Sequence, residues 1–79
     1  MAEYRYTVYF EPLAGGGYNV VFPAIPEICT FGRTLDEARA MAADALRCHL
    51  EALKKDGESF PMEGTPLESP IRDEVAVSL

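Results

Sequence analysis

The chain has 79 residues, of which 48% are hydrophobic and 25% charged, and its 13 Asp and Glu against 7 Lys and Arg give a formal net charge of −6. This balance is typical of a soluble globular protein, and the length allows a single domain, predicted at 1–79. It disfavours disorder, nucleic-acid binding through bulk positive charge, and a membrane span, which needs roughly 20 apolar residues. The first residues lack the apolar run of a signal peptide, so we expect a cytoplasmic protein with no membrane partner.

The chain has two cysteines, Cys29 and Cys48, and one histidine, His49. Small disulfide-stabilised domains contain more cysteines per residue than this chain does, so a disulfide is disfavoured. The three residues lack the paired spacing of zinc ligands, so we predict neither a metal nor a cofactor. A core this small usually needs further support, and oligomerisation is the expected form of it.

The first 32 residues predict three strands. Residues 3–11 alternate with a period of two, which is typical of a strand. The two faces of this strand carry different sets, Tyr4, Tyr6, Val8 and Phe10 on one side and Arg5, Thr7 and Tyr9 on the other. Glycines 15–17 predict a hairpin loop, and residues 18–22 the return strand. After a loop with two prolines, residues 29–31 predict a short third strand that Gly32 ends.

A helix is predicted from Thr34 to about Asp56. Thr34 and Glu37 have the spacing of a capping box, and Gly57 is a favourable residue just beyond the last turn. An apolar stripe follows the helical period: Leu35, Ala38, Ala42, Ala45, Leu46, His49 and Leu53. One face of the helix should therefore pack on the sheet, with the other in water.

Residues 58–70 contain three prolines and predict an extended linker to a fourth strand within 71–79. The order is then β-β-β-α-β. We predict an α+β fold in which a small antiparallel-led sheet carries one helix on one face.

One helix leaves the second face of the sheet available to water or a partner. The linker of residues 58–70 is long enough to let the last strand pair with its own sheet or with a neighbour's. The predicted partner or oligomer surface combines both features: Arg5, Thr7, Tyr9, Asn19, Val21, Val75 and Val77. We expect a homo-oligomer, most simply a dimer, built through sheet edges or this face.

No residue pattern predicts catalysis. His49 falls in the helix stripe and is expected as a core or rim side chain, while Cys48 points about 100° away from it. A two-metal nuclease site needs clustered carboxylates, and the first strand has acids only at its ends, Glu3 and Glu11. Glycines 15–17 lack the Lys-Ser/Thr of a phosphate loop. We therefore predict a protein that is not an enzyme.

Residues 22–38 read Phe-Pro-Ala-Ile-Pro-Glu-Ile-Cys-Thr-Phe-Gly-Arg-Thr-Leu-Asp-Glu-Ala. This segment resembles the signature of the HicB-like antitoxin family, which is Phe-Pro-Asp-Leu-Pro-Gly, a short strand ending Thr-x-Gly, then Asp-Thr-Leu-Glu-Glu-Ala. Further matching positions are Gly16, Gly17, Tyr18, Val20, Ala42, Ala45, Leu46, Gly57 and Pro61. The resemblance covers about residues 4–61. Three positions depart from it: Ala24 replaces Asp, Glu27 replaces Gly and Arg33 replaces Asp.

The resemblance implies a partial ribonuclease-H-like fold and a type II antitoxin that neutralises a small basic HicA-type mRNA-cleaving toxin. The negative charge would then speed association with that toxin. Longer members add a C-terminal DNA-binding domain that this sequence does not include, so no direct nucleic-acid contact is expected. The alternative is an orphan HicB-like domain, serving as a self-assembling scaffold or small-ligand binder. A small basic reading frame beside the gene would favour the antitoxin.

Overall fold

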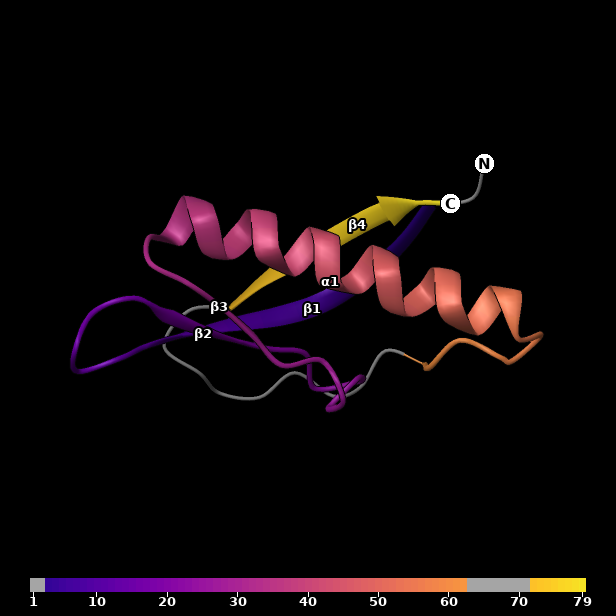
Figure 1. The fold of residues 1–79 in the computed structure, drawn as a ribbon, viewed down its shortest axis with the longest axis horizontal. Helices are drawn as coiled ribbons and strands as arrows, with labels where there is room; N and C mark the ends of the chain where they lie inside the picture. The colour runs from indigo at the N-terminus through magenta and orange to yellow at the C-terminus, as the bar shows by residue number, and fades with distance from the viewer. Residues whose placement is uncertain (1–2, 63–71) are drawn as a thin grey trace.

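The computed structural model describes residues 3–62 and 72–79. Its elements follow the order β-β-β-α-β (Figure 1): β1 Glu3–Pro12, β2 Tyr18–Val21, β3 Thr30–Gly32, α1 Leu35–Lys55 and β4 Arg72–Ser78. The predicted α+β class and element order are confirmed, and each predicted boundary lies within one residue of the observed one. Residues 63–70, most of the predicted linker, lie outside the described residues.

The four strands form one antiparallel sheet in the order β3-β2-β1-β4. The first strand is therefore interior to the sheet, with Tyr9 opposite Val21 on one side and Tyr6 opposite Val75 on the other. Figure 1 shows α1 lying along the sheet, over β1 and β4. Among the strands, β1 supplies the most residues to the buried cluster: Tyr6, Val8 and Phe10.

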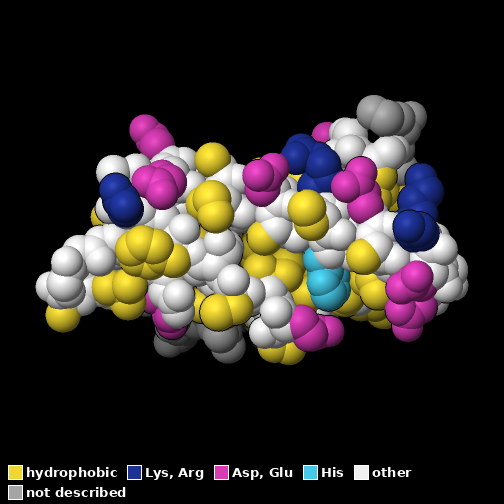
Figure 2. Space-filling view, viewed as in Figure 1, with side chains coloured by type: hydrophobic (Ala, Val, Ile, Leu, Met, Phe, Trp, Pro, Cys, Tyr) yellow, Lys and Arg dark blue, Asp and Glu magenta, His cyan; other side chains and the backbone are white. Residues whose placement is uncertain are grey.

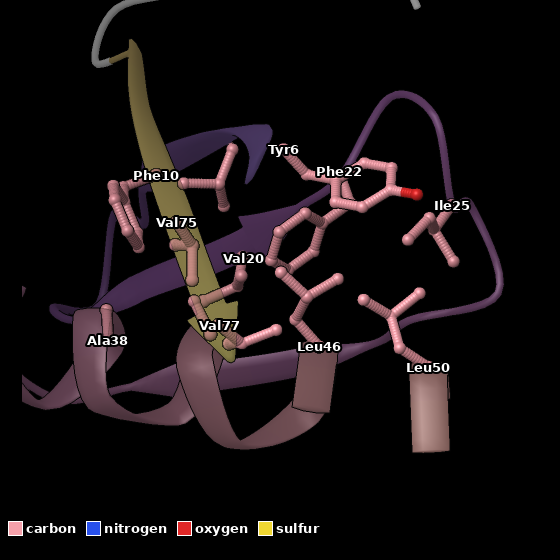
Figure 3. Packing of buried hydrophobic residues seen from close by; sticks show 12 residues of the cluster. Tyr6, Phe10, Val20, Phe22, Ile25, Ala38, Leu46, Leu50, Val75 and Val77 are labelled. Carbon is pink, nitrogen blue, oxygen red and sulfur yellow. The ribbon is translucent and has the colours of Figure 1, made fainter. Parts of the chain in front are cut away.

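The core lies between α1 and the sheet, as Figure 3 shows. Its fully buried side chains come from every layer: Val8, Phe10, Phe22, Ile25, Ala38, Ala42, Leu46 and Leu50. Tyr6, Val20, Val75 and Val77 complete the strand side of the cluster. The predicted apolar face of the first strand is thus the buried face, because its period of two directs these side chains toward the helix.

The loop between β2 and β3 consists of two consecutive turns. The amide of Ile25 donates to the Phe22 carbonyl at 3.0 Å, and the amide of Ile28 donates to the Ile25 carbonyl at 3.1 Å. A proline, Pro23 or Pro26, follows the first residue of each turn, where its fixed φ is favourable. Ile25 sits where the two turns join and is fully buried, so it anchors the loop to the core.

Both ends of α1 are capped as predicted. Thr34 Oγ1 accepts a hydrogen bond from the Glu37 amide at 3.1 Å. At the other end Gly57 has a φ of +72°. Its amide donates to the Lys54 carbonyl at 3.1 Å, and the Glu58 amide donates to the Leu53 carbonyl at 2.9 Å. This pair of bonds is a Schellman motif, which satisfies carbonyls that the end of the helix leaves open.

The buried side of α1 does not follow the straight stripe that the sequence predicts. The buried residues are each four positions apart: Ala38, Ala42, Leu46 and Leu50. His49 is half-buried, at the rim and not near the centre of the stripe. Four residues advance a helix by about 40° more than one turn, so this row winds slowly around α1. The sheet beneath is twisted, and the buried row follows it.

Candidate partner-binding surface

The second face of the sheet is less open than predicted. Arg5 is exposed and pairs with Glu3 at 2.8 Å and with Glu74 at 3.8 Å. Thr7 and Tyr9, by contrast, are each only 1% exposed. Both belong to the interior strand, and the middle of that strand is covered on both faces. The expectation that Thr7 and Tyr9 offer a partner surface is therefore corrected.

The two valines of the last strand also lie inside this chain. Val75 is opposite Tyr6 and Val77 is opposite Tyr4, so both valines share the face that α1 covers. They are 8% and 2% exposed. The register of β4 against β1 decides this placement, because a shift of one residue would turn both valines outward. Val75 and Val77 are thus core residues, and not the exposed surface that was predicted.

Asn19 and Val21, the remaining members of the predicted surface, lie on β2 and are half-buried. With Arg5 they are the part of the predicted set that keeps contact with solvent. The structure therefore does not bring the seven residues together as one accessible surface. Two other parts of the molecule are accessible to a partner: a patch at one end of the sheet and the outer edge of β4.

The first is a patch at the end of the sheet where the β1–β2 hairpin turns, which we call the end patch: Leu13, Gly15, Gly16, Gly17, Phe31 and Arg33. All but Leu13 line a shallow pocket of about 330 Å³. Leu13 and Phe31 are 42% and 43% exposed, high values for large apolar side chains. Figure 2 shows hydrophobic and charged side chains side by side at this end of the molecule.

The glycines of the hairpin shape this patch. The Leu13 amide donates to the Gly17 carbonyl at 3.0 Å, and the Gly16 amide donates to the Leu13 carbonyl at 2.9 Å. Gly16 and Gly17 have φ values of +100° and +84°, which side chains rarely tolerate. A Cβ at Gly17 would lie 2.6 Å from the ring of Phe31. The glycine backbone therefore lets the Phe31 ring lie directly against the hairpin.

Charged residues border the end patch. Arg33 lines the pocket, and Asp36 and Glu37 follow in the first turn of α1. The Asp36 side chain is 99% exposed. The backbone of this turn lies close to β3, because a Cβ at Gly32 would be 2.3 Å from the Ala38 nitrogen. The end patch thus combines exposed apolar side chains with the charged Arg33, and two acidic residues follow Arg33 closely in the chain.

The sequence predicts Phe31 as a residue of the third strand, and the predicted partner surface includes neither Phe31 nor Leu13. A signal for Phe31 was available in the alternation of the third strand. Gly32 faces α1 so closely that no side chain fits there, and its neighbour Phe31 must then point to the opposite side. The exposure of Leu13 has no comparable local signal.

The second feature is the outer edge of β4, a strand of seven residues at the border of the sheet. The bond from Leu13 to Gly17 continues the β1–β2 ladder, so odd-numbered residues of β1 direct their amides toward β2. The amides and carbonyls of even-numbered β1 residues then point toward β4, and those of their partners Val75 and Val77 point toward β1. The amides and carbonyls of Glu74, Ala76 and Ser78 therefore point outward.

One end of this edge is occupied. The Glu74 amide donates to Asp73 Oδ1 at 2.8 Å. The other oxygen of that carboxylate, Oδ2, accepts from Arg39 Nε of α1 at 3.1 Å. Asp73 therefore caps the outward amide of Glu74, and Arg39 holds the Asp73 carboxylate in place. The half of the edge around Ala76 carries no such side-chain cap within the described residues.

The described residues contain neither a set of three or more His, Cys, Asp and Glu side chains placed to hold a metal ion nor a helix able to cross a membrane. Cys29 and Cys48 are both exposed and free. The two strand acids considered for nuclease chemistry, Glu3 and Glu11, lie near opposite ends of β1. These placements give no support for a catalytic centre.

Comparison with known proteins gives consistent matches. The model of the HicB-like antitoxin of bacterial toxin–antitoxin systems matches residues 6–75. Antitoxin HicB 1 of Photorhabdus laumondii is 48% identical over 60 residues, which are 76% of this chain and 39% of that protein. Antitoxin HicB of Escherichia coli K12 is 42% identical over 65 residues, 82% of this chain and 46% of that protein.

A UPF0150 protein of Thermoplasma acidophilum is 37% identical over 59 residues, covering 75% of this chain and 86% of that protein. The crystal structure of the N-terminal domain of Burkholderia pseudomallei antitoxin HicB superposes with a TM-score of 0.80 at 24% identity, covering 96% of this chain and 100% of that one. This chain spans less than half the length of the HicB relatives. The fold and the extent of the family match together place the chain in the HicB-like antitoxin family.

Proposed function

We propose that this chain is a non-enzymatic antitoxin that acts in the cytoplasm by binding and neutralising a small basic HicA-type mRNA-cleaving toxin. The observation that carries the proposal is the family match across residues 6–75. The net charge of −6 supports it, because a negative surface attracts a basic partner and speeds their encounter. Among the described residues, the end patch and the β4 edge are surfaces that such a partner could reach.

Co-expression tests this function directly. Expression of a HicA-type toxin encoded beside the gene should arrest growth, and this chain should restore it. The association rate constant of the purified pair should fall by about tenfold or more from low to high salt, because salt screens surface charges. Stopped-flow mixing measures that rate. Growth that stays arrested despite soluble antitoxin would contradict the function, and a salt-independent rate would remove the electrostatic argument.

The Thermoplasma relative gives a specific reason to keep the orphan domain as the second candidate. Unlike the HicB relatives, it matches this chain over 86% of its own length, and its name does not call it an antitoxin. In that case the chain would self-assemble as a scaffold or bind a small ligand. The absence of both a basic neighbouring reading frame and a toxin-dependent phenotype would favour it.

We also propose that the chain forms a two-fold dimer by pairing the outer edges of two β4 strands. The edge is seven residues long and lacks the proline and lysine residues with which proteins usually protect such edges. An antiparallel pair around Ala76 would use the outward groups that Asp73 does not cap. It would leave as free edges only the two β3 strands, each of three residues.

Replacing Ala76 with proline tests this contact selectively. Proline removes the outward amide and its ring blocks the approach of a second strand, while the bonds from β4 to β1 remain. Light scattering at micromolar concentration should give a mass of two chains for the parent and for Ala76→Ser, but one chain for Ala76→Pro. Circular dichroism should be unchanged. A parent mass of one chain refutes the dimer, and a dimeric Ala76→Pro moves the contact elsewhere.

A further inference from the structure

The described residues include four large hydrophobic side chains that are markedly exposed: Leu13, Phe31, Met41 and Met62. Two of them, Leu13 and Phe31, belong to the end patch, although they are 18 positions apart in the sequence. We propose that the end patch is the surface on which a basic toxin docks, with Phe31 as the main anchor. This inference rests on the proposed antitoxin function and adds the place where the partner binds.

The geometry of Phe31 suits an anchoring role. Its ring lies against the backbone of Gly17, where even a Cβ would come within 2.6 Å. Gly32 beside it cannot shift toward α1, because its backbone already lies against Ala38. A ring fixed in this way loses little conformational freedom on binding, which is one reason why aromatic residues dominate binding energy at interfaces.

The pocket beside the ring is preformed. Its volume of about 330 Å³ is bounded by the hairpin glycines, Phe31 and Arg33. This volume lies at the lower end of the range of ligand-binding pockets. It suits the insertion of a single large apolar side chain from a partner, and Leu13 would cover the neighbouring part of that contact.

The charges around the pocket favour a basic partner over a second copy of this chain. Asp36 and Glu37 follow Arg33 by three and four residues in the first turn of α1, and the Asp36 side chain, which pairs with Arg39 at 3.7 Å, is 99% exposed. Lysine or arginine residues that flank the inserted side chain would meet these carboxylates. A second copy carries the same net charge of −6, so overall charge speeds the encounter with a basic toxin but not with a second copy. Arg33 adds selectivity, because it requires a carbonyl or carboxylate oxygen opposite it.

Binding of a HicA-type toxin, purified as a catalytically inactive variant, tests the inference. We expect Phe31→Ala to raise the dissociation constant measured by calorimetry at least tenfold, the size of an interface hot spot. Leu13→Ala should raise it less. Met41→Ala is the matched control, because Met41 is 40% exposed, close to the 43% of Phe31, but lies on α1 and does not line the pocket. Its affinity should stay within about twofold of the parent value.

A charge variant gives a second readout. Asp36→Asn combined with Glu37→Gln should slow association and leave dissociation almost unchanged, since rim charges act mainly on encounter. If the parent chain binds and Phe31→Ala binds equally well, the end patch is not the docking surface and the antitoxin function stands. If the parent chain itself does not bind, the proposed function falls and this inference with it. A loss of parent oligomer mass in Phe31→Ala would instead assign the patch to contacts between copies and overturn the inference.

Discussion

Replacing Gly32 with alanine is expected to lower the free energy of unfolding by roughly 3 kcal/mol or more, at the upper end of the cost of overpacking. The added Cβ would lie 2.3 Å from the nitrogen and 2.4 Å from the Cα of Ala38. These are backbone atoms of the first turns of α1, so no side-chain rotation can relieve the contact. Either β3 or the start of the helix must move, and Ala38 is itself fully buried.

Gly15→Ala is the control for this experiment. A Cβ at Gly15 would meet nothing within 4 Å, and its φ does not require glycine. The substitution should leave stability unchanged or raise it by about 0.4–1 kcal/mol, because alanine restricts the unfolded chain. Thermal unfolding followed by circular dichroism compares the two variants. Similar melting temperatures for both would show that β3 and α1 are not in the close contact described above.

Replacing Leu50 with alanine is the second substitution with a large expected effect. Leu50 is fully buried in the core, at the end of the row that starts at Ala38. Truncating a buried leucine costs about 2–5 kcal/mol, because apolar contact is lost and a cavity remains. For a domain of this size that corresponds to a fall in melting temperature of roughly 10 °C or more. Chemical denaturation gives the free energy, with a nearly constant m-value expected.

His49→Ala makes this experiment specific. The straight stripe predicted from the sequence places His49 near the middle of the buried side and leaves Leu50 out. The structure places Leu50 in the core and His49 at the rim. His49→Ala should therefore cost less than about 1 kcal/mol, as is usual away from the core. If His49→Ala proved as damaging as Leu50→Ala, the straight stripe would describe the helix better than the winding row.

The elements of this fold were predictable because local chemistry determines them. The alternation in residues 3–11 marked β1, and its apolar side is the buried one. Thr34 and Gly57 marked the ends of α1, since a side-chain oxygen and a positive φ act within a few residues of the chain. The motif in residues 22–38 identified the family, and the match across residues 6–75 confirmed it.

The candidate surfaces were less predictable, because they depend on contacts between distant parts of the chain. The sequence predicts Phe31 only as a residue of the third strand, and it gives no sign that Leu13 is exposed. The end patch exists because the β1–β2 hairpin and β3 meet at one end of the sheet. Likewise, the position of β4 at the sheet border, which exposes the edge around Ala76, follows from strand order and not from the residues of β4.

By itself, the sequence determined the element order, the caps of the helix, the apolar face of β1 and the family. Tertiary structure alone decided the register that turns Val75 and Val77 under α1, and the burial of Thr7 and Tyr9. It also decided that Leu50, and not His49, is the fully buried residue of the helix. Periodicity tells which residues share a face, but it cannot tell which neighbour covers that face or how the twist of a sheet rotates the buried side of a helix. Those choices are made when distant side chains pack into one core.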